Sequence, residues 1–151
     1  MTRRVLVVED GTEYVEAFRR LAGDSEDVEF VRAPHGADAR RLLSQSPVDA
    51  LFLDVVFDRT PPEALVGNLE DLARRHAGDR ARALEHLARN QGFYVLSELA
   101  PLIPPGIPVL IAHDFASQAP RLEALRETVP GLEGVAESTG ITRVLERLLR
   151  G

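Results

Sequence analysis

Short, uninterrupted apolar runs recur along the chain and most constrain its fold. They are VLVV at residues 5–8, ALFL at residues 50–53 and PVLIA at residues 108–112. Runs of this length without polar alternation are typical of strands buried on both faces of a parallel sheet. Residues 28–32 alternate like a further strand, and residues 134–136 form a short fifth one.

Helical patterns separate these strands. The apolar spacing predicts helices at residues 13–22, 37–43, 68–89, 92–99, 120–127 and 142–149. Thr12 is in position to cap the first of them. An alternation of strand and helix repeated about five times predicts an α/β fold, a doubly wound parallel sheet with helices on both faces. A length of 151 residues fits one domain over residues 1–151.

The segment at residues 59–90 departs from this rhythm and is predicted to be a helical insertion after the third strand. Its helical stretch weakens at Gly78 and Asp79, so it forms either one kinked helix or two short helices. Arg74, Arg75 and Arg82 give it a basic face, which indicates a partner surface or a site of self-association. The alternatives are a solvated helix that packs on the domain and a lid over the neighbouring edge of the sheet.

Acids follow the predicted strands at the edge where such sheets bind ligands. Glu9 and Asp10 follow the first strand, and Asp54 follows the third. Gathered carboxylates repel one another, and a hard divalent cation relieves that repulsion. We therefore predict a Mg²⁺ site with Asp10 and Asp54 as direct ligands. Glu9 would act through water, and the backbone carbonyl of Val56 would supply another oxygen.

These features resemble the receiver domains of bacterial response regulators, the CheY-like family. The resembling stretches are VLVVED at residues 5–10, APHGADA at 33–39, PVDALFLD at 47–54, GFYVL at 92–96 and PVLIA at 108–112. The resemblance implies a flavodoxin-like sheet of order 2-1-3-4-5. It also implies that Asp54 accepts a phosphoryl group from a histidine kinase and that Glu9 and Asp10 hold magnesium.

Three positions depart from the family pattern. Ser138 stands where the family has a lysine, His113 where it has a hydroxyl residue, and Val135 where it has a switch aromatic. All 18 basic residues are arginine, so no lysine is available to pair with a phosphoryl group, which adds roughly −1.5 to −2 charge. The chain is therefore predicted to be a degenerate receiver. His113 could instead lend a positive charge to the site, or be neutral and bonded to a loop carbonyl or to Asp114.

Three functions remain open. The first is a stand-alone signalling module that docks to a histidine kinase or another signalling protein, with weak or absent phosphoryl switching and no enzymatic activity. The second is a competent Mg²⁺-dependent phosphoacceptor at Asp54. The third, more remote, is an aspartate-based phosphohydrolase, which would need an acid where Val56 stands. A net charge of −6 argues against nucleic-acid binding, and the absence of a long apolar run argues against a membrane span. We expect a cytoplasmic protein that is able to form a homodimer.

Overall fold

A five-stranded parallel sheet forms the centre of the molecule. The computed structural model describes residues 2–150. The strands are β1 (Arg3–Val8), β2 (Val28–Ala33), β3 (Ala50–Leu53), β4 (Val109–Ile111) and β5 (Leu132–Gly134). All pairs are parallel, and the order is β2-β1-β3-β4-β5. The predicted fold class and strand order are confirmed.

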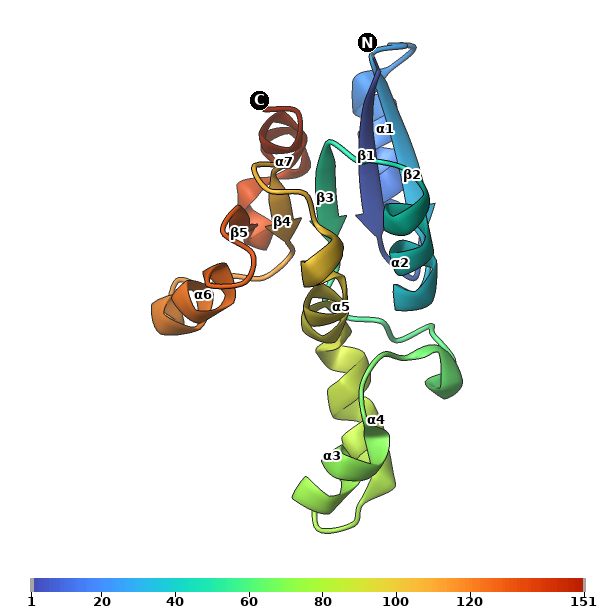
Figure 1. Ribbon diagram of the computed structural model, residues 1–151, viewed down its shortest axis with the longest axis vertical. Helices are drawn as coiled ribbons and strands as arrows, with labels where there is room; N and C mark the ends of the chain where they lie inside the picture. Colours follow the sequence, from blue (N-terminus) through green and yellow to red (C-terminus); the bar gives the residue numbers. More distant parts are fainter. Residues whose placement is uncertain (1, 151) are drawn as a thin grey trace.

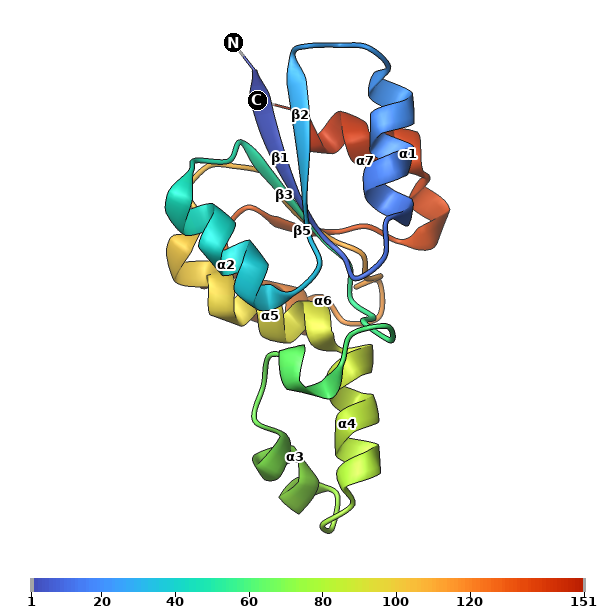
Figure 2. The ribbon, with the colours of Figure 1, turned by 90° about the vertical axis from the view of Figure 1, so that its right-hand side faces the viewer.

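Helices cover both faces of the sheet, as Figure 2 shows. They are α1 (Glu13–Ala22), α2 (Gly36–Gln45), α5 (Gln91–Leu99), α6 (Ala119–Arg126) and α7 (Ile141–Leu148). Helices α1 and α7 enclose one core with the sheet, and α2 and α5 enclose the other. Every residue of β3 and β4 is buried, which explains why their sequences are apolar without interruption.

The insertion consists of a 3-10 turn, η1 (Pro62–Ala64), followed by α3 (Leu69–Arg75) and α4 (Arg80–Arg89). The helical stretch is therefore two short helices rather than one kinked helix. The chain reverses between them at Ala77 and Gly78, both of which have positive φ. Leu72, Ala73, Ala83 and Leu87 form a small apolar core of their own. The two helices project beyond the carboxyl ends of the strands (Figure 1).

Two local predictions are corrected by the structure. The fifth strand spans Leu132–Gly134, two residues earlier than predicted, and a 3-10 turn, η3 (Glu137–Thr139), follows it. Thr12 occupies the N-cap position of α1, but its side chain makes no capping hydrogen bond. Glu9 supplies that function instead. No helix within residues 2–150 combines the length and apolar character needed to cross a bilayer.

Candidate functional site

Parallel pairing brings the strand-end acids to one edge of the sheet. Val8 lies opposite Leu53 in the register, so Glu9 and Asp54 follow at the same level. The amide of Asp54 donates to the carbonyl of Val8 at 2.9 Å, which continues the ladder to this point. The charges of Glu9, Asp10 and Glu13 all act on Asp54, so these acids belong to the same edge of the sheet.

Asp54 is partly buried, and burial is the main reason that its pKa is raised to about 6. The nearby negative charges of Glu9, Asp10 and Glu13 raise this pKa further. A hydrogen bond of 2.9 Å from the amide of Val55 to Oδ1 acts in the opposite direction. A carboxyl group that titrates near neutral pH is available in both protonation states, as groups at functional sites often are.

Glu9 has a structural role that its sequence position did not reveal. Only 1% of its surface is exposed. Its two carboxylate oxygens accept the amides of Tyr14 at 3.1 Å and Val15 at 2.7 Å. These are orphan donors of the first turn of α1, so Glu9 caps the helix from three residues before the N-cap. Burial raises the pKa of Glu9, and the two amides partly offset this effect.

Asp10 connects the acidic edge to the insertion. Its Oδ2 accepts the backbone amide of Arg59 at 2.7 Å and faces the hydroxyl of Thr60 at 3.5 Å. The Arg59 guanidinium pairs with Glu13 at 2.6 Å, and this hydrogen bond lowers the pKa of Glu13. Arg32 donates to the carbonyls of Asp10 and Gly11. Two arginines thus hold the loop that carries Asp10.

A cleft of about 410 Å³ opens beside Asp54. Tyr14 and α7 residues line one part of it, and Ala112, Val135 and Glu137 line another. Burial, followed by the charge of Asp54, raises the pKa of Tyr14. Within residues 2–150, this cleft has no cationic side chain in its lining, and its only hydroxyl is the phenol of Tyr14.

The first of the three predicted switch positions, His113, does not line the Asp54 cleft. His113 was predicted to replace the family's hydroxyl residue beside Asp54, but β4 ends at Ile111 and Ala112 lies opposite Asp54. The His113 ring instead packs edge-on against Phe93 and Phe115. Its Nε2 is 2.8 Å from the side-chain oxygen of Gln118, so its bonding partner is neither Asp114 nor a loop carbonyl.

The other two switch positions lie after β5. Val135 is buried and lines the cleft, as its predicted position requires. Ser138, predicted at the lysine position, does not line the cleft, whereas the preceding Glu137 does. The ionisable group that this loop contributes to the cleft is therefore an acid. Side-chain alternation along the sequence could not identify Glu137 as the residue that lines the cleft, because η3 interrupts the strand pattern.

The acidic edge only partly fits the predicted magnesium site. No group of three or more His, Cys, Asp or Glu side chains in the described chain is arranged to hold a metal ion. Glu9, predicted to act on the metal through water, is occupied by the backbone amides of Tyr14 and Val15. Magnesium commonly takes one or two carboxylates and keeps several waters. Asp10 and Asp54 meet that requirement chemically, and the Val56 carbonyl accepts no hydrogen bond within residues 2–150.

The predicted partner surface on the insertion is exposed. Arg74 pairs with Asp71, and Arg80 pairs with Glu70. Arg75 and Arg82 are exposed and have no ion pair within the described residues. Neighbouring acids therefore neutralise part of the predicted basic face, and Arg75 and Arg82 retain its positive charge.

Comparison with known proteins identifies the fold. No family model matches the sequence, and no curated protein matches it. The chain is similar in structure to the receiver domain of Francisella response regulator 1452, with 15% identity, a TM-score of 0.59, and 97% of this chain and 93% of that chain covered. A CheY-like receiver domain from Methanospirillum hungatei gives 14% identity and a TM-score of 0.59, covering 98% of this chain and 91% of that one.

A third similar structure is a response regulator from Burkholderia pseudomallei with a phosphorylated aspartic acid, a calcium ion and citrate. It is 17% identical, with a TM-score of 0.56, and the match covers 97% of this chain and 66% of that chain. At these identities, the likeness shows the fold. The resemblance seen in the sequence is thus confirmed as a receiver-type fold that spans nearly the whole chain.

Proposed function

We propose that this chain is an atypical receiver module in two-component signalling, which acts mainly by docking to another protein. On this view, phosphoryl transfer to Asp54 is weak or absent, and the chain is not an enzyme. The partner would be a histidine kinase or another signalling protein. The receiver fold supports the signalling class, and the chemistry beside Asp54 supports the atypical character.

The composition of the Asp54 cleft is the observation that carries this proposal. An incoming phosphoryl group brings roughly −1.5 to −2 charge. The cleft presents Glu137, Ala112 and Val135 to it, so it offers an acid, a methyl group and an apolar side chain. The pKa of Asp54, about 6, already reflects a poorly solvated site among acids. A second negative charge would be opposed there rather than stabilised.

Magnesium would change this balance if it bound. Asp10, Asp54 and the carbonyl of Val56 are the residues that would hold it. A bound divalent cation would supply positive charge that screens the carboxylates from each other and from a phosphoryl group. Glu9 would remain the cap of α1 and would keep the loop of Asp10 in place.

The direct test is intact-mass spectrometry after incubation with acetyl phosphate and Mg²⁺. We expect little or no gain of one phosphoryl mass over a time in which an ordinary receiver domain, run in parallel, is fully modified. Asp54→Asn supplies the control for modification elsewhere. Rapid, stoichiometric modification that this substitution abolishes would overturn the proposed weak phosphorylation.

That outcome would favour the second candidate, a competent phosphoacceptor. One observation supports this candidate: Asp54 lines an open cleft and is reachable from solvent. The structurally similar Burkholderia pseudomallei protein contains a phosphorylated aspartic acid. A phosphohydrolase has less support, because the side chain two positions after Asp54 is Val56, which cannot serve as an acid.

The insertion is the proposed docking surface, with Arg75 and Arg82 as its free cations and Arg74 beside them. A second copy of this chain is one partner that can be tested directly, because the chain is acidic overall. Sedimentation at several concentrations measures self-association of the parent chain. Arg75→Glu with Arg82→Glu should reduce any dimer formed through this surface, whereas Arg143→Glu on α7 should leave it unchanged.

A further inference from the structure

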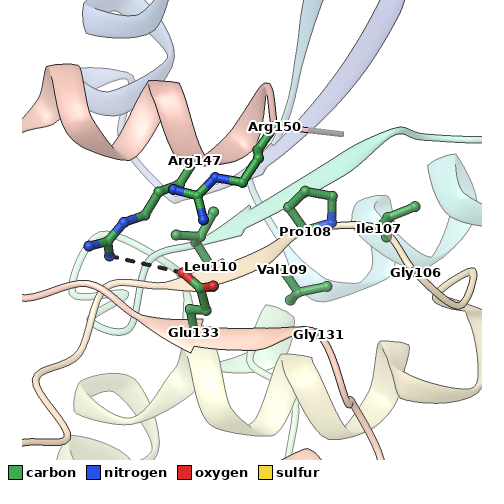
Figure 3. A pocket seen from close by; sticks show the side chains of 9 residues that line it. All are labelled: Gly106, Ile107, Pro108, Val109, Leu110, Gly131, Glu133, Arg147 and Arg150. Atoms are coloured by element: carbon green, nitrogen blue, oxygen red, sulfur yellow. Dashed lines mark ion pairs between the residues drawn. The ribbon is translucent and has the colours of Figure 1, made fainter.

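A second cleft lies at the other end of the strands that border Asp54. It has a volume of about 270 Å³ and is formed by the start of β4, the start of β5 and the end of α7. Ile107, Pro108 and Leu110 give it an apolar floor. Figure 3 shows Arg147 and Arg150 on one side of this floor, with Glu133 reaching toward them from β5. The carboxyl-end and amino-end clefts thus lie at opposite ends of β4, β5 and α7.

The charges in this amino-end cleft are unbalanced. Arg147 pairs with Glu133 at 4.0 Å, which is a long ion pair. Arg150 is exposed, and its guanidinium makes no ion pair or hydrogen bond within residues 2–150. Two cations and one acid leave a local excess of positive charge in a chain whose net charge is −6. The carboxyl end of α7 adds a partial negative charge. This charge is smaller than the combined positive charge of the two arginines.

We propose that this cleft binds a small organic acid, namely a single carboxylate on a short apolar body. A guanidinium offers a planar pair of donors that matches a carboxylate in two parallel hydrogen bonds. Arg150 supplies this fork directly, and Arg147 adds charge beside it. Ile107, Pro108 and Leu110 would remove the apolar body from water, which favours binding in proportion to the area covered.

The size of the cleft restricts the ligand. Sites for drug-sized molecules usually span about 300–1,000 Å³, so a volume of about 270 Å³ suits a body of only a few carbons. Hexanoate is an appropriate probe because it joins one carboxylate to a short alkyl chain. For a molecule of this size, a dissociation constant on the order of 1 mM is reasonable.

The test is a titration of the full chain followed by amide NMR at constant ionic strength. Hexanoate should produce saturable shifts at residues 106–110 and 131–133. Hexanol lacks the charge and sulfate lacks the apolar body, so each should bind at least about tenfold more weakly. Arg150→Ala should weaken hexanoate binding about tenfold. Glu133→Gln should strengthen it a few-fold, because it removes the repelling carboxylate.

Arg143→Ala is the matched control, because Arg143 is an exposed arginine of the same helix that does not line the cleft. It should bind hexanoate as the parent chain does. Absence of saturation up to about 20 mM, or equal binding of hexanol and hexanoate, would overturn the proposal. Equal losses of hexanoate affinity in Arg143→Ala and Arg150→Ala would also overturn it. None of these outcomes depends on whether Asp54 is phosphorylated.

Discussion

The backbone amide of Arg59 donates a 2.7 Å hydrogen bond to Oδ2 of Asp10, which joins residues 49 positions apart. The first residue of the insertion is therefore fastened to the acid loop of the sheet. The guanidinium of Arg59 strengthens this attachment through Glu13. Any cation that recruits the Asp10 carboxylate must share it with the base of the insertion.

Asp10→Ala should loosen this base. Loss of a hydrogen bond to a charged group typically costs about 1.5–3 kcal/mol, and the lower end applies because this bond is exposed to solvent. We expect amide hydrogen exchange at Arg59 to accelerate roughly tenfold. Asp58→Ala is the matched control, because it removes a neighbouring acid that accepts no hydrogen bond in the described chain. Equal acceleration in both variants would show that the attachment does not depend on Asp10.

Asp54 should make folding stability depend on pH. Its folded pKa is about 6, above the ordinary value of 3.8. The folded state therefore binds the proton more tightly than the unfolded state, and this contribution to stability falls as pH rises from about 4 to about 6. Above that range, the ionised group destabilises the fold, on the order of 1–2 kcal/mol after allowance for solvent screening.

Asp54→Asn tests this sign. The substitution removes the charge and keeps the shape, so it should stabilise the protein at pH 8, and the gain should disappear near pH 4. Urea unfolding at both values measures the difference. Asp24→Asn, at an exposed acid, controls for the loss of one surface charge. A gain that is the same at both pH values would contradict the raised pKa.

Gln91 should be essential for the attachment of the insertion. It is 1% exposed, its side-chain oxygen accepts the amide of Val66 at 2.6 Å, and its side-chain nitrogen donates to the carbonyls of Val66 and Leu87. Gln91→Ala leaves these backbone groups without partners, which should cost about 2–4 kcal/mol in unfolding free energy. Gln45→Ala, at an exposed glutamine, should cost less than about 0.5 kcal/mol. Urea unfolding compares the two variants.

Gly92→Ala should disturb the contact between α5 and the end of β3. An added Cβ would lie 2.2 Å from the carbonyl oxygen of Asp54 and 2.8 Å from Cα of Val55. Both are backbone atoms, so the helix must shift, at an expected cost of about 1–3 kcal/mol. Thermal unfolding measures the loss, with Ser97→Ala on the exposed side of the same helix as control. If the two variants have the same melting temperature, the close contact at Gly92 does not contribute to stability.

Glu137→Lys should improve phosphorylation of Asp54 more than Ser138→Lys does. Glu137 lines the cleft and Ser138 does not, so we expect the first substitution to place an ammonium group in the cleft. Acetyl phosphate and intact-mass spectrometry measure the rate, which we expect to rise about tenfold or more. A larger effect from Ser138→Lys would mean that the side chain at position 138, rather than the one at position 137, points into the cleft.

The sequence alone determined the architecture. The strands at residues 5–8, 50–53 and 108–112 could be recognised because burial on both faces allows no polar alternation. Parallel strands end at the same edge, so Glu9, Asp10 and Asp54 had to converge once the strands were recognised. The insertion was also visible, because Pro61 and Pro62 open a charged helical segment where the alternation of strand and helix stops.

The tertiary structure decided which side chain does what at that edge. Ala112 lies on the face of the sheet that carries Leu110 and lines the Asp54 cleft, whereas His113 packs against Phe93 and Phe115. A shift of one residue moves a side chain to the opposite face, and apolar composition does not fix the register at a strand end. Glu9 rather than Thr12 caps α1, and Arg59 reaches Asp10, because both contacts depend on the path of the chain in space. Local sequence carries no signal for either contact.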